Sequence, residues 1–393
     1  MGKTVLSLIM AIFICLSFSL NAVAGDSDTV GEIYVNNDLA ATLNLNCKSA
    51  ILMDAATGTV LYEQNADEAL PPASVTKIMT LLLVMEAIEG GSIKLEDMVS
   101  VSENAASMGG SQIFLEVGET MSVEDLLKSV IIASANDAAV ALAEYVAGSE
   151  EAFVARMNER ARELSMNNTC FENTNGLDDT VTKHLTSARD IAIMSRELIK
   201  HEKVLEYSSI WMDTVRNGAF GLTNTNRLVR FYNGATGLKT GSTANAKFCV
   251  SATAKRGNMH LICVIMGAET RDLRNAYAMK LLDYGFANYS LFSAEGKKLD
   301  EVKVLGGREA TVAIEYGEFN AVVNKGEADN ITSEIIVNEK ICAPIKIGDG
   351  VGKVIYKNGE KTVGESKIYA TENIEKIRFG DIFVSIIIKI LLK

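Results

Sequence analysis

The segment PPASVTKIMTLLLVMEAI, residues 71–88, constrains the fold and chemistry of this chain more than any other stretch. Ser74 and Lys77 stand three positions apart where an apolar run begins, so in a helix their side chains share one face. Burial among apolar side chains lowers the pKa of a lysine from its usual value of about 10.4. A neutral Lys77 can act as a base, and Ser74 then becomes a nucleophile. The alternative is an ordinary core helix with two incidental polar residues, since the run is too short to span a membrane.

After residue 24, a Ser-x-Asn pattern occurs three times, at 102–104, 134–136 and 165–167. The second copy differs from the others because it lies between apolar stretches of predicted helix. Polar side chains in such a place need a partner or a function. Ser134 can relay a proton, and Asn136 can hold an amide of a substrate.

A Lys-Thr-Gly sequence occurs once, in a strand-like run. Lys239 supplies a cation, Thr240 supplies a hydroxyl, and Gly241 lets a ligand approach the backbone closely. The alternative interpretation is a solvated edge strand.

The order of strand-like and helical stretches favours one α+β domain. Apolar alternation predicts two strands over 49–68, with a turn at Thr57-Gly58, and three more strands between 235 and 268. The last two of these are joined through residues 256–258. Apolar periodicity and capping residues predict helices at 74–88, 122–148, 150–166, 186–200 and 274–286.

The composition changes near residue 295, where short alternating stretches replace the helical patterns. Asn358-Gly359 is a strong signal for a hairpin turn. We therefore expect a linker over 25–45, an α+β domain over 46–292 and a small all-β domain over 293–373.

Both ends of the chain carry apolar segments outside these domains. Lys3, the apolar stretch 5–20 and the small residues 22–24 predict a secretory signal peptide over residues 1–24, with an uncleaved anchor as the alternative. In the tail, 374–393, polar residues recur at every fourth position from Asp381, which keeps them on one helix face. We expect an amphipathic helix on the outer face of the cytoplasmic membrane, or otherwise a helix packed on the β domain.

Charge and composition exclude several partners. The formal net charge is −12, without a basic cluster, which disfavours nucleic acid. Five cysteines follow Cys15 of the predicted signal peptide, and no two of them have CxxC spacing. We therefore favour free thiols. The alternative is a disulfide between Cys249 and Cys263, which lie on neighbouring predicted strands. The 3 histidines are scattered, and no metal site is expected.

Ser-x-x-Lys, Ser-x-Asn and Lys-Thr-Gly in this order form the set typical of penicillin-binding proteins and class A β-lactamases. With PPASVTKIMT, IIASANDAAVALAEYVAG, NTNGLDD, LTSARDIAIMSREL and TGLKTGST, the chain resembles the low-molecular-weight D-alanyl-D-alanine carboxypeptidases over nearly its whole mature length. The resemblance implies a penicillin-binding, transpeptidase-like domain with an antiparallel sheet and a cluster of helices. It also implies a serine-type carboxypeptidase that acts on the peptidoglycan stem peptide, needs no cofactor and is inhibited by β-lactam antibiotics.

The resemblance assigns roles to the residues of the first two motifs. Ser74 matches the serine that is acylated, and Lys77 matches its proton acceptor. Ser134 and Asn136 match the second motif.

The resemblance also assigns the substrate-binding strand. Lys239, Thr240 and Gly241 match the third motif, and the backbone N–H of Ser242 matches one half of an oxyanion hole shared with the nucleophile. Arg274 matches an arginine that holds the substrate carboxylate, because a planar guanidinium can donate two parallel hydrogen bonds to a carboxylate. The alternative is that Arg274 is a surface residue of a helix without a role in binding. Ser242 departs from the family members that carry histidine after Lys-Thr-Gly.

Two other functions fit parts of the sequence. A secreted β-lactamase needs a base for deacylation, and Glu172 is the candidate. Two features disfavour this function: Gly176 stands where asparagine is expected, and the second motif is Ser-Ala-Asn in place of Ser-Asp-Asn. A non-catalytic cell-wall-binding module would not need all three motifs.

Overall fold

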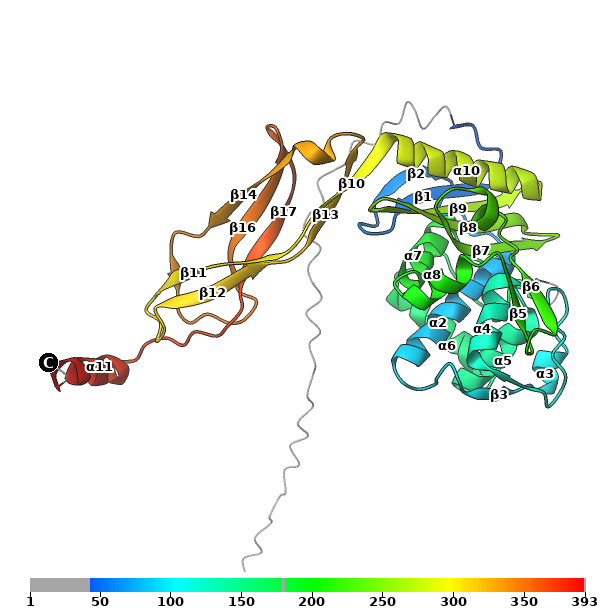
Figure 1. Ribbon diagram of the computed structural model, residues 1–393, viewed down its shortest axis with the longest axis horizontal. Coiled ribbons are helices and arrows are strands. Elements are labelled where there is room, and N and C mark those ends of the chain that lie inside the picture. The colour runs from blue at the N-terminus through cyan, green and yellow to red at the C-terminus, as the bar shows by residue number, and fades with distance from the viewer. Residues whose placement is uncertain (1–42, 179–180, 392–393) are drawn as a thin grey trace, which may run out of the picture.

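The computed structural model describes residues 43–178 and 181–391, which form two lobes lying end to end (Figure 1). The first lobe contains a sheet covered by helices on both faces, and the second is built from strands. This arrangement confirms the predicted α+β domain followed by an all-β domain. The predicted signal peptide and residues 25–42 of the predicted linker lie outside the described residues.

The sheet of the first lobe is antiparallel, with the strand order β2-β1-β9-β8-β7. Strand β7 lies at the edge and carries the Lys-Thr-Gly sequence, so one side of this sequence is open to a ligand. Residues 257 and 258 connect β8 to β9, as predicted. The strands are β1 (Ser49–Asp54), β2 (Val60–Gln64), β7 (Ala235–Thr243), β8 (Lys247–Arg256) and β9 (Met259–Ala268).

Each face of this sheet has its own hydrophobic core because successive side chains on a strand point to opposite faces. Helix α10 (Arg271–Asn288) covers one face, and most of the other helices of the lobe cover the opposite face (Figure 1). Cys249 belongs to the core on the face opposite α10, whereas Cys263 belongs to the core between the sheet and α10. The two cannot pair, and the five cysteines of the described chain are free thiols, as favoured from the sequence.

The helices follow the predicted periodicity with two corrections. Ser74 lies in a 3₁₀ turn, Ala73–Thr76, that leads into α2, and is not inside an α-helix. The expected continuous helix over 122–148 is wrong, because the chain breaks around Ser134, where φ is +62°. The main helices beneath the sheet are α2 (Lys77–Glu89), α4 (Val123–Ile132), α5 (Asn136–Ala147), α6 (Glu150–Glu163), α7 (Ala188–Leu198) and α8 (Glu202–Ser208).

The second lobe is a six-stranded sheet with the order β14-β16-β17-β12-β11-β15, joined to the first lobe through the β10–β13 pair. Its core is separate from the two cores of the first lobe. The strands are β10 (Tyr289–Ala294), β11 (Lys297–Leu305), β12 (Thr311–Tyr316), β13 (Phe319–Asn324), β14 (Ile331–Val337), β15 (Ile341–Cys342), β16 (Gly350–Asn358) and β17 (Lys361–Ala370).

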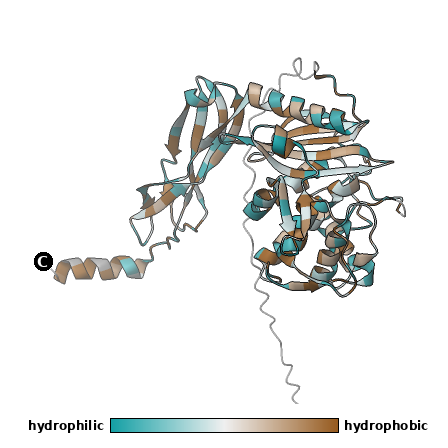
Figure 2. Cartoon of the chain, turned by 45° about the vertical axis from the view of Figure 1, so that its right-hand side comes forward, coloured by the Kyte–Doolittle hydropathy of each residue, from teal (hydrophilic) through white to brown (hydrophobic). Residues whose placement is uncertain are grey.

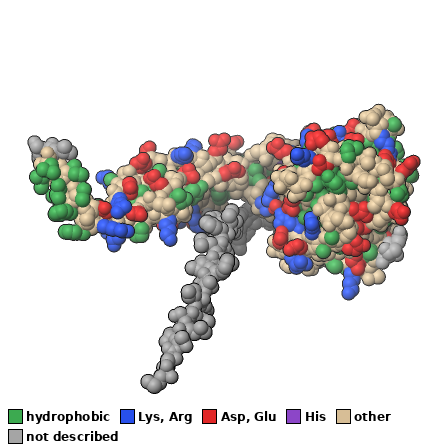
Figure 3. All heavy atoms as spheres, turned by 90° about the horizontal axis from the view of Figure 1, so that it is seen from below, with side chains coloured by type: hydrophobic (Ala, Val, Ile, Leu, Met, Phe, Trp, Pro, Cys, Tyr) green, Lys and Arg blue, Asp and Glu red, His purple; other side chains and the backbone are tan. Residues whose placement is uncertain are grey.

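Helix α11 (Phe379–Leu391) lies beyond the second lobe, at the end of the molecule farthest from the first lobe (Figure 1). Arg308 of the second lobe forms ion pairs with Glu375 at 2.8 Å and with Asp381 at 3.1 Å, which connects the start of the helix to the lobe. The apolar side chains of the helix are not buried: Phe383 is 56% exposed and Ile390 is 69% exposed. They form an apolar surface at this tip (Figures 2 and 3). Within 43–178 and 181–391, no helix is both long and apolar enough to cross a bilayer.

Candidate active site

The 3₁₀ turn before α2 places a serine hydroxyl next to a lysine amine. Side chains three residues apart nearly eclipse one another in such a turn. The Nζ atom of Lys77 accordingly lies 2.9 Å from Oγ of Ser74. Ser74 borders a cavity, whereas Lys77 is fully buried below it.

Two further acceptors surround the Lys77 amine. Nζ donates to Oδ1 of Asn136 at 2.5 Å and to the backbone carbonyl of Asn175 at 2.9 Å. The Asn136 amide is oriented by its own Nδ2, which donates to the carbonyl of Gly109 at 2.7 Å. Both groups facing Lys77 can therefore only accept. A neutral amine uses its two N–H bonds on them, and its lone pair is then directed at the hydroxyl of Ser74.

The surroundings also favour the neutral form of Lys77. Burial lowers the pKa of Lys77 well below the ordinary lysine value, and the nearby charge of Lys239 lowers it further. The carboxylate of Asp137 acts in the opposite direction but is the smallest of the three effects. The physical basis for the predicted base at Lys77 is therefore present in the structure.

Ser134 lies in the break between α4 and α5 and faces the same cavity. The Nζ atom of Lys239, on β7, donates to its Oγ at 2.7 Å. Lys239 is 1% exposed, and burial, with the charge of Arg274, lowers its pKa to about 7. The second and third motifs are therefore in direct contact, although 105 residues separate them.

Strand β7 approaches the nucleophile turn so closely that only glycine fits at position 241. A Cβ atom on Gly241 would lie 2.8 Å from the carbonyl oxygen of Pro72 and 2.9 Å from the backbone nitrogen of Ser74. This approach places β7, at the residue before Ser242, beside the backbone nitrogen of Ser74, and the oxyanion hole of the Ser74 and Ser242 N–H groups stays a prediction.

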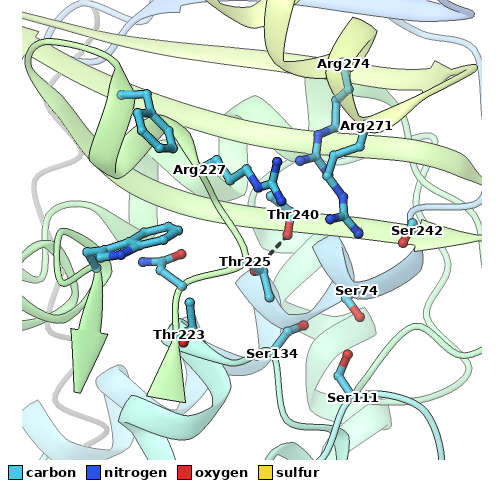
Figure 4. A pocket seen from close by; sticks show the side chains of 14 residues that line it. Ser74, Ser111, Ser134, Thr223, Thr225, Arg227, Thr240, Ser242, Arg271 and Arg274 are labelled. Carbon is cyan, nitrogen blue, oxygen red and sulfur yellow. Dashed lines mark hydrogen bonds between the residues drawn. The ribbon is translucent and has the colours of Figure 1, made fainter. Parts of the chain in front are cut away.

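A cavity of about 560 Å³ opens in front of these groups (Figure 4). Thr240 on its wall donates to Oγ1 of Thr225 at 2.9 Å. The cavity is lined by Ser74, Ser111, Ser134, Trp211, Thr223, Asn224, Thr225, Arg227, Phe231, Thr240, Gly241, Ser242, Arg271 and Arg274.

Three arginines lie along one side of the cavity (Figure 4). Arg274 is 3% exposed, so the alternative of a surface helix residue is wrong. Its guanidinium donates to Oδ1 of the neighbouring Asn275 at 2.9 and 3.1 Å and to the carbonyl of Cys249 at 3.4 Å. Burial and the charge of Arg271 lower the pKa of Arg274 to about 10, which leaves it cationic at neutral pH.

Sequence reasoning missed the contribution of the segment 170–178. Asn175 presents its backbone carbonyl to Lys77, and a backbone acceptor leaves no signal in a side-chain motif. Gly176, with φ of +85°, lies against Ala73: a Cβ atom there would be 1.9 Å from the Ala73 oxygen. The glycine noted in the sequence as a departure from the β-lactamase pattern thus allows close packing on the nucleophile turn.

His184 was also missed, and it connects this segment to the nucleophile turn. Its Nδ1 accepts from the backbone N–H of Glu172 at 3.0 Å, so the proton is assigned to Nε2. Nε2 lies 2.7 Å from Oγ1 of Thr76, which donates to the carbonyl of Ala73 at 2.8 Å. Neutral His184 therefore fits both of its neighbours.

The remaining sequence candidates lie elsewhere. Ser102 accepts from the backbone N–H of Ala105 and begins the short helix α3 (Glu103–Ala106). Ser165 follows the end of α6. Glu172, the candidate base of a β-lactamase, is exposed and accepts from the backbone N–H groups of Thr182 and Lys183. None of the three borders the cavity.

Comparison with known families agrees with this geometry. Residues 36–270 match the family model described as D-alanyl-D-alanine carboxypeptidase, peptidase family S11. The chain belongs to this family. Residues 286–376 of this D-alanyl-D-alanine carboxypeptidase family member match the C-terminal domain of penicillin-binding protein 5.

Individual members of the D-alanyl-D-alanine carboxypeptidase family are similar over most of the chain. DacF of Bacillus subtilis is 45% identical over 339 residues, covering 84% of this chain and 87% of that protein. DacC of Escherichia coli is 37% identical, covering 85% of each.

Solved structures in this family share the fold. Penicillin-binding protein 5 from Haemophilus influenzae aligns with a TM-score of 0.75 at 31% identity, covering 85% of this chain and 98% of that one. Penicillin-binding protein D2 from Listeria monocytogenes in its ampicillin-bound form aligns with a TM-score of 0.57 at 33% identity, covering 62% and 99%.

Proposed function

We propose that this protein is a serine-type D-alanyl-D-alanine carboxypeptidase that removes the terminal D-alanine from peptidoglycan pentapeptide stems. The single observation that carries the proposal is the buried Lys77 amine. Its two acceptor-only neighbours leave its lone pair for the hydroxyl of Ser74.

Acylation begins when Ser74 Oγ attacks the carbonyl carbon of the penultimate D-alanine and Lys77 takes its proton. The oxyanion that forms lies beside the backbone N–H groups of Ser74 and Ser242, and Asn136 holds the substrate amide. The substrate carboxylate is attracted to Lys239, Thr240 and the buried guanidinium of Arg274.

Release of the first product breaks the C–N bond. Ser134, whose hydroxyl accepts from Lys239, gives its proton to the departing amine and takes one from the Lys239 ammonium, and D-alanine leaves. Water then attacks the ester on Ser74 and passes a proton through Ser134 to the neutral Lys239, while Lys77 returns its proton to the Ser74 oxygen and restores the free hydroxyl. The products are D-alanine and a tetrapeptide stem with a new carboxylate. A β-lactam presents its strained amide to Ser74 in the same way and forms an ester on the same oxygen.

Incubation of purified muropeptides with the mature chain, followed by mass spectrometry, tests this function. We expect pentapeptides to lose one D-alanine and become tetrapeptides, and we expect Ser74→Ala to prevent this. Persistence of the pentapeptides, under conditions where the protein is folded, would refute the carboxypeptidase assignment. Hydrolysis of penicillin at rates far above those of the peptide would instead favour the β-lactamase alternative.

We also propose that the protein acts outside the cytoplasm and is attached peripherally to the outer face of the cytoplasmic membrane. The predicted signal peptide over 1–24 supports export. The exposed apolar side chains of α11 support an interfacial helix, because a helix of 13 residues is about 20 Å long, short of the ~30 Å hydrocarbon core.

A further inference from the structure

The residue before the nucleophile has a strained backbone. Ala73 has a φ of +48°, in the left-handed region that residues other than glycine rarely adopt, and it is 1% exposed. Such a conformation persists only where the surrounding structure holds it. Because Ser74 is the next residue, the conformation of Ala73 decides where the Ser74 hydroxyl lies relative to Lys77. A contact that holds Ala73 therefore also positions the nucleophile.

The carbonyl of Ala73 is held by a hydroxyl of the same turn. Oγ1 of the fully buried Thr76 donates to it at 2.8 Å. A hydroxyl has one proton and rotates to suit its neighbours, so a donor aimed at Oγ1 directs this proton towards Ala73. His184 supplies such a donor. Its Nε2 lies 2.7 Å from Oγ1 and carries the proton, because Nδ1 accepts from the backbone N–H of Glu172.

The imidazole ring of His184 is itself a rigid support. It is 4% exposed, and burial lowers its pKa to about 4, which keeps it neutral at neutral pH. The ring of Phe171 packs against it edge to face, with centroids 5.8 Å apart. Two residues further on, Thr186 exchanges backbone hydrogen bonds of 2.8 and 3.0 Å with Leu70, three residues before Ala73. The histidine and the nucleophile turn are therefore fixed to each other through the backbone as well.

We propose that His184 is a positioning residue for the acylation of Ser74. Its Nε2–H orients the Thr76 hydroxyl, and this hydroxyl holds the Ala73 carbonyl in the strained conformation. Without the donor, the Thr76 hydroxyl rotates, the strain at Ala73 relaxes, and Ser74 spends less time in line with the lone pair of Lys77. The inference rests on the proposed function and adds to it a residue that touches neither the substrate nor the reacting atoms.

Two amide side chains separate the roles of the two ring nitrogens. Glutamine places a donor near the position of Nε2 and can bind Thr76, whereas asparagine reaches only the position of Nδ1, beside the N–H of Glu172. Stopped-flow experiments with a fluorescent penicillin give the acylation rate constant at saturation and the Kd of the complex that precedes it. We expect His184→Asn to lower the rate constant about tenfold and to change the Kd less than twofold. His184→Gln should keep at least half of the rate constant.

The outcomes of this comparison decide the inference. An acylation rate constant for His184→Asn equal to that of the unmodified protein would overturn it. Equal losses in the asparagine and glutamine variants would overturn it too, because they would indicate packing and not the Nε2 donor. Absence of acylation in the unmodified protein would instead refute the proposed carboxypeptidase.

A double-mutant cycle tests whether His184 acts through Thr76. Thr76→Val removes the hydroxyl and nearly keeps the shape of the side chain. If the effect passes through this hydroxyl, the double variant Thr76→Val/His184→Asn should acylate no more slowly than Thr76→Val alone. Losses that multiply would show that the two residues act independently, and the inference would be wrong.

His260 offers a matched control on the same sheet. Its Nε2 also lies 3.0 Å from a threonine hydroxyl, Oγ1 of Thr236, near the start of β7 and five residues before Gly241. His260→Asn should lower the free energy of unfolding and leave the acylation rate constant unchanged, with the folded fraction counted by titration with the same penicillin. A tenfold loss in this variant as well would overturn the specific role of His184.

A measurement on the unmodified protein needs no variant to fold. With ¹⁵N-labelled histidine, NMR distinguishes the two neutral tautomers of each ring. We expect the proton of His184 on Nε2 at neutral pH. A proton on Nδ1 would make Nε2 an acceptor for Thr76, would take the Thr76 proton away from Ala73, and would overturn the proposal.

Discussion

Lys77 and Ser74 share a hydrogen bond of 2.9 Å in which the lysine is the fully buried partner and the serine borders the cavity. The two acceptors on the other sides of Lys77 fix the direction of its remaining lone pair. The proton of Ser74 thus has an acceptor before a substrate arrives.

We expect Ser74 to be the residue that β-lactams acylate. After treatment with labelled penicillin and digestion, the adduct should appear on the peptide containing Ser74, and Ser74→Ala should abolish both labelling and turnover. An adduct on Ser102 or Ser134 would contradict this assignment.

Replacement of Lys77 by arginine should remove the base and leave a fixed positive charge in its place. A guanidinium is not deprotonated in proteins, so the acylation rate should fall by roughly 10²–10⁴-fold, the range typical of a lost general base. Stopped-flow acylation by penicillin measures this rate, with circular dichroism as a control for folding. An acylation rate near that of the unmodified protein would show that Lys77 is not the base.

Arg274→Ala should weaken recognition of a free carboxylate. Because Arg274 is buried, its removal also disturbs packing, so the informative quantity is a ratio between two substrates. A charge-assisted bond contributes about 1.5–3 kcal/mol, so activity on a D-Ala-D-Ala peptide should fall about 10- to 100-fold more than on its carboxamide analogue. Equal losses would indicate a purely structural role.

The free energy of unfolding should decrease as the pH falls from about 6.5 to about 4. Burial lowers the pKa of His184 to about 4, so the unfolded chain binds a proton in this window that the folded chain does not. The loss is roughly 3 kcal/mol at the lower end. His184→Gln should flatten this part of the profile in urea titrations at several pH values. His260 behaves similarly, so the variant should retain part of the slope.

A chain that ends at Ile377 should remain folded and active on small peptides but should not sediment with membranes. This end keeps the bond from the Ile377 N–H to the carbonyl of Gly306 and the buried Ile374, and it removes α11. Flotation with anionic lipid vesicles compares it with the full mature chain. Equal partitioning of the two proteins into the soluble fraction would refute the anchor.

Local sequence patterns were sufficient for much of the fold. The β8–β9 hairpin follows from a glycine-containing turn between apolar strands, and α6 and α7 follow from their periodicity and their serine caps. The break at Ser134 could not be predicted, because its neighbours are compatible with a helix. Tertiary contacts determine it: Lys239 binds Ser134, and the backbone N–H of Asn136 donates to the carbonyl of Ser111 at 2.7 Å.

The motifs of the site could likewise be predicted from the sequence, but the groups that support the motif residues could not. Ser74, Lys77, Ser134, Asn136, Lys239 and Thr240 come together as their order suggested. The Asn175 carbonyl reaches Lys77 because of where the folded backbone places it. His184 contacts Thr76 through a ring nitrogen whose protonation depends on its folded surroundings. Neither contact could be predicted from residue spacing.

The nucleophile turn is confined by two glycines from different parts of the chain, Gly241 on one side and Gly176 on the other. A β-lactam and a stem peptide form esters on the same Ser74 oxygen, so a side chain at either glycine would displace the oxygen for both. Antibiotic resistance arising in this enzyme should therefore avoid these positions. We expect selection under penicillin to change residues at the cavity rim, where drug and peptide differ in shape, and to leave both glycines untouched.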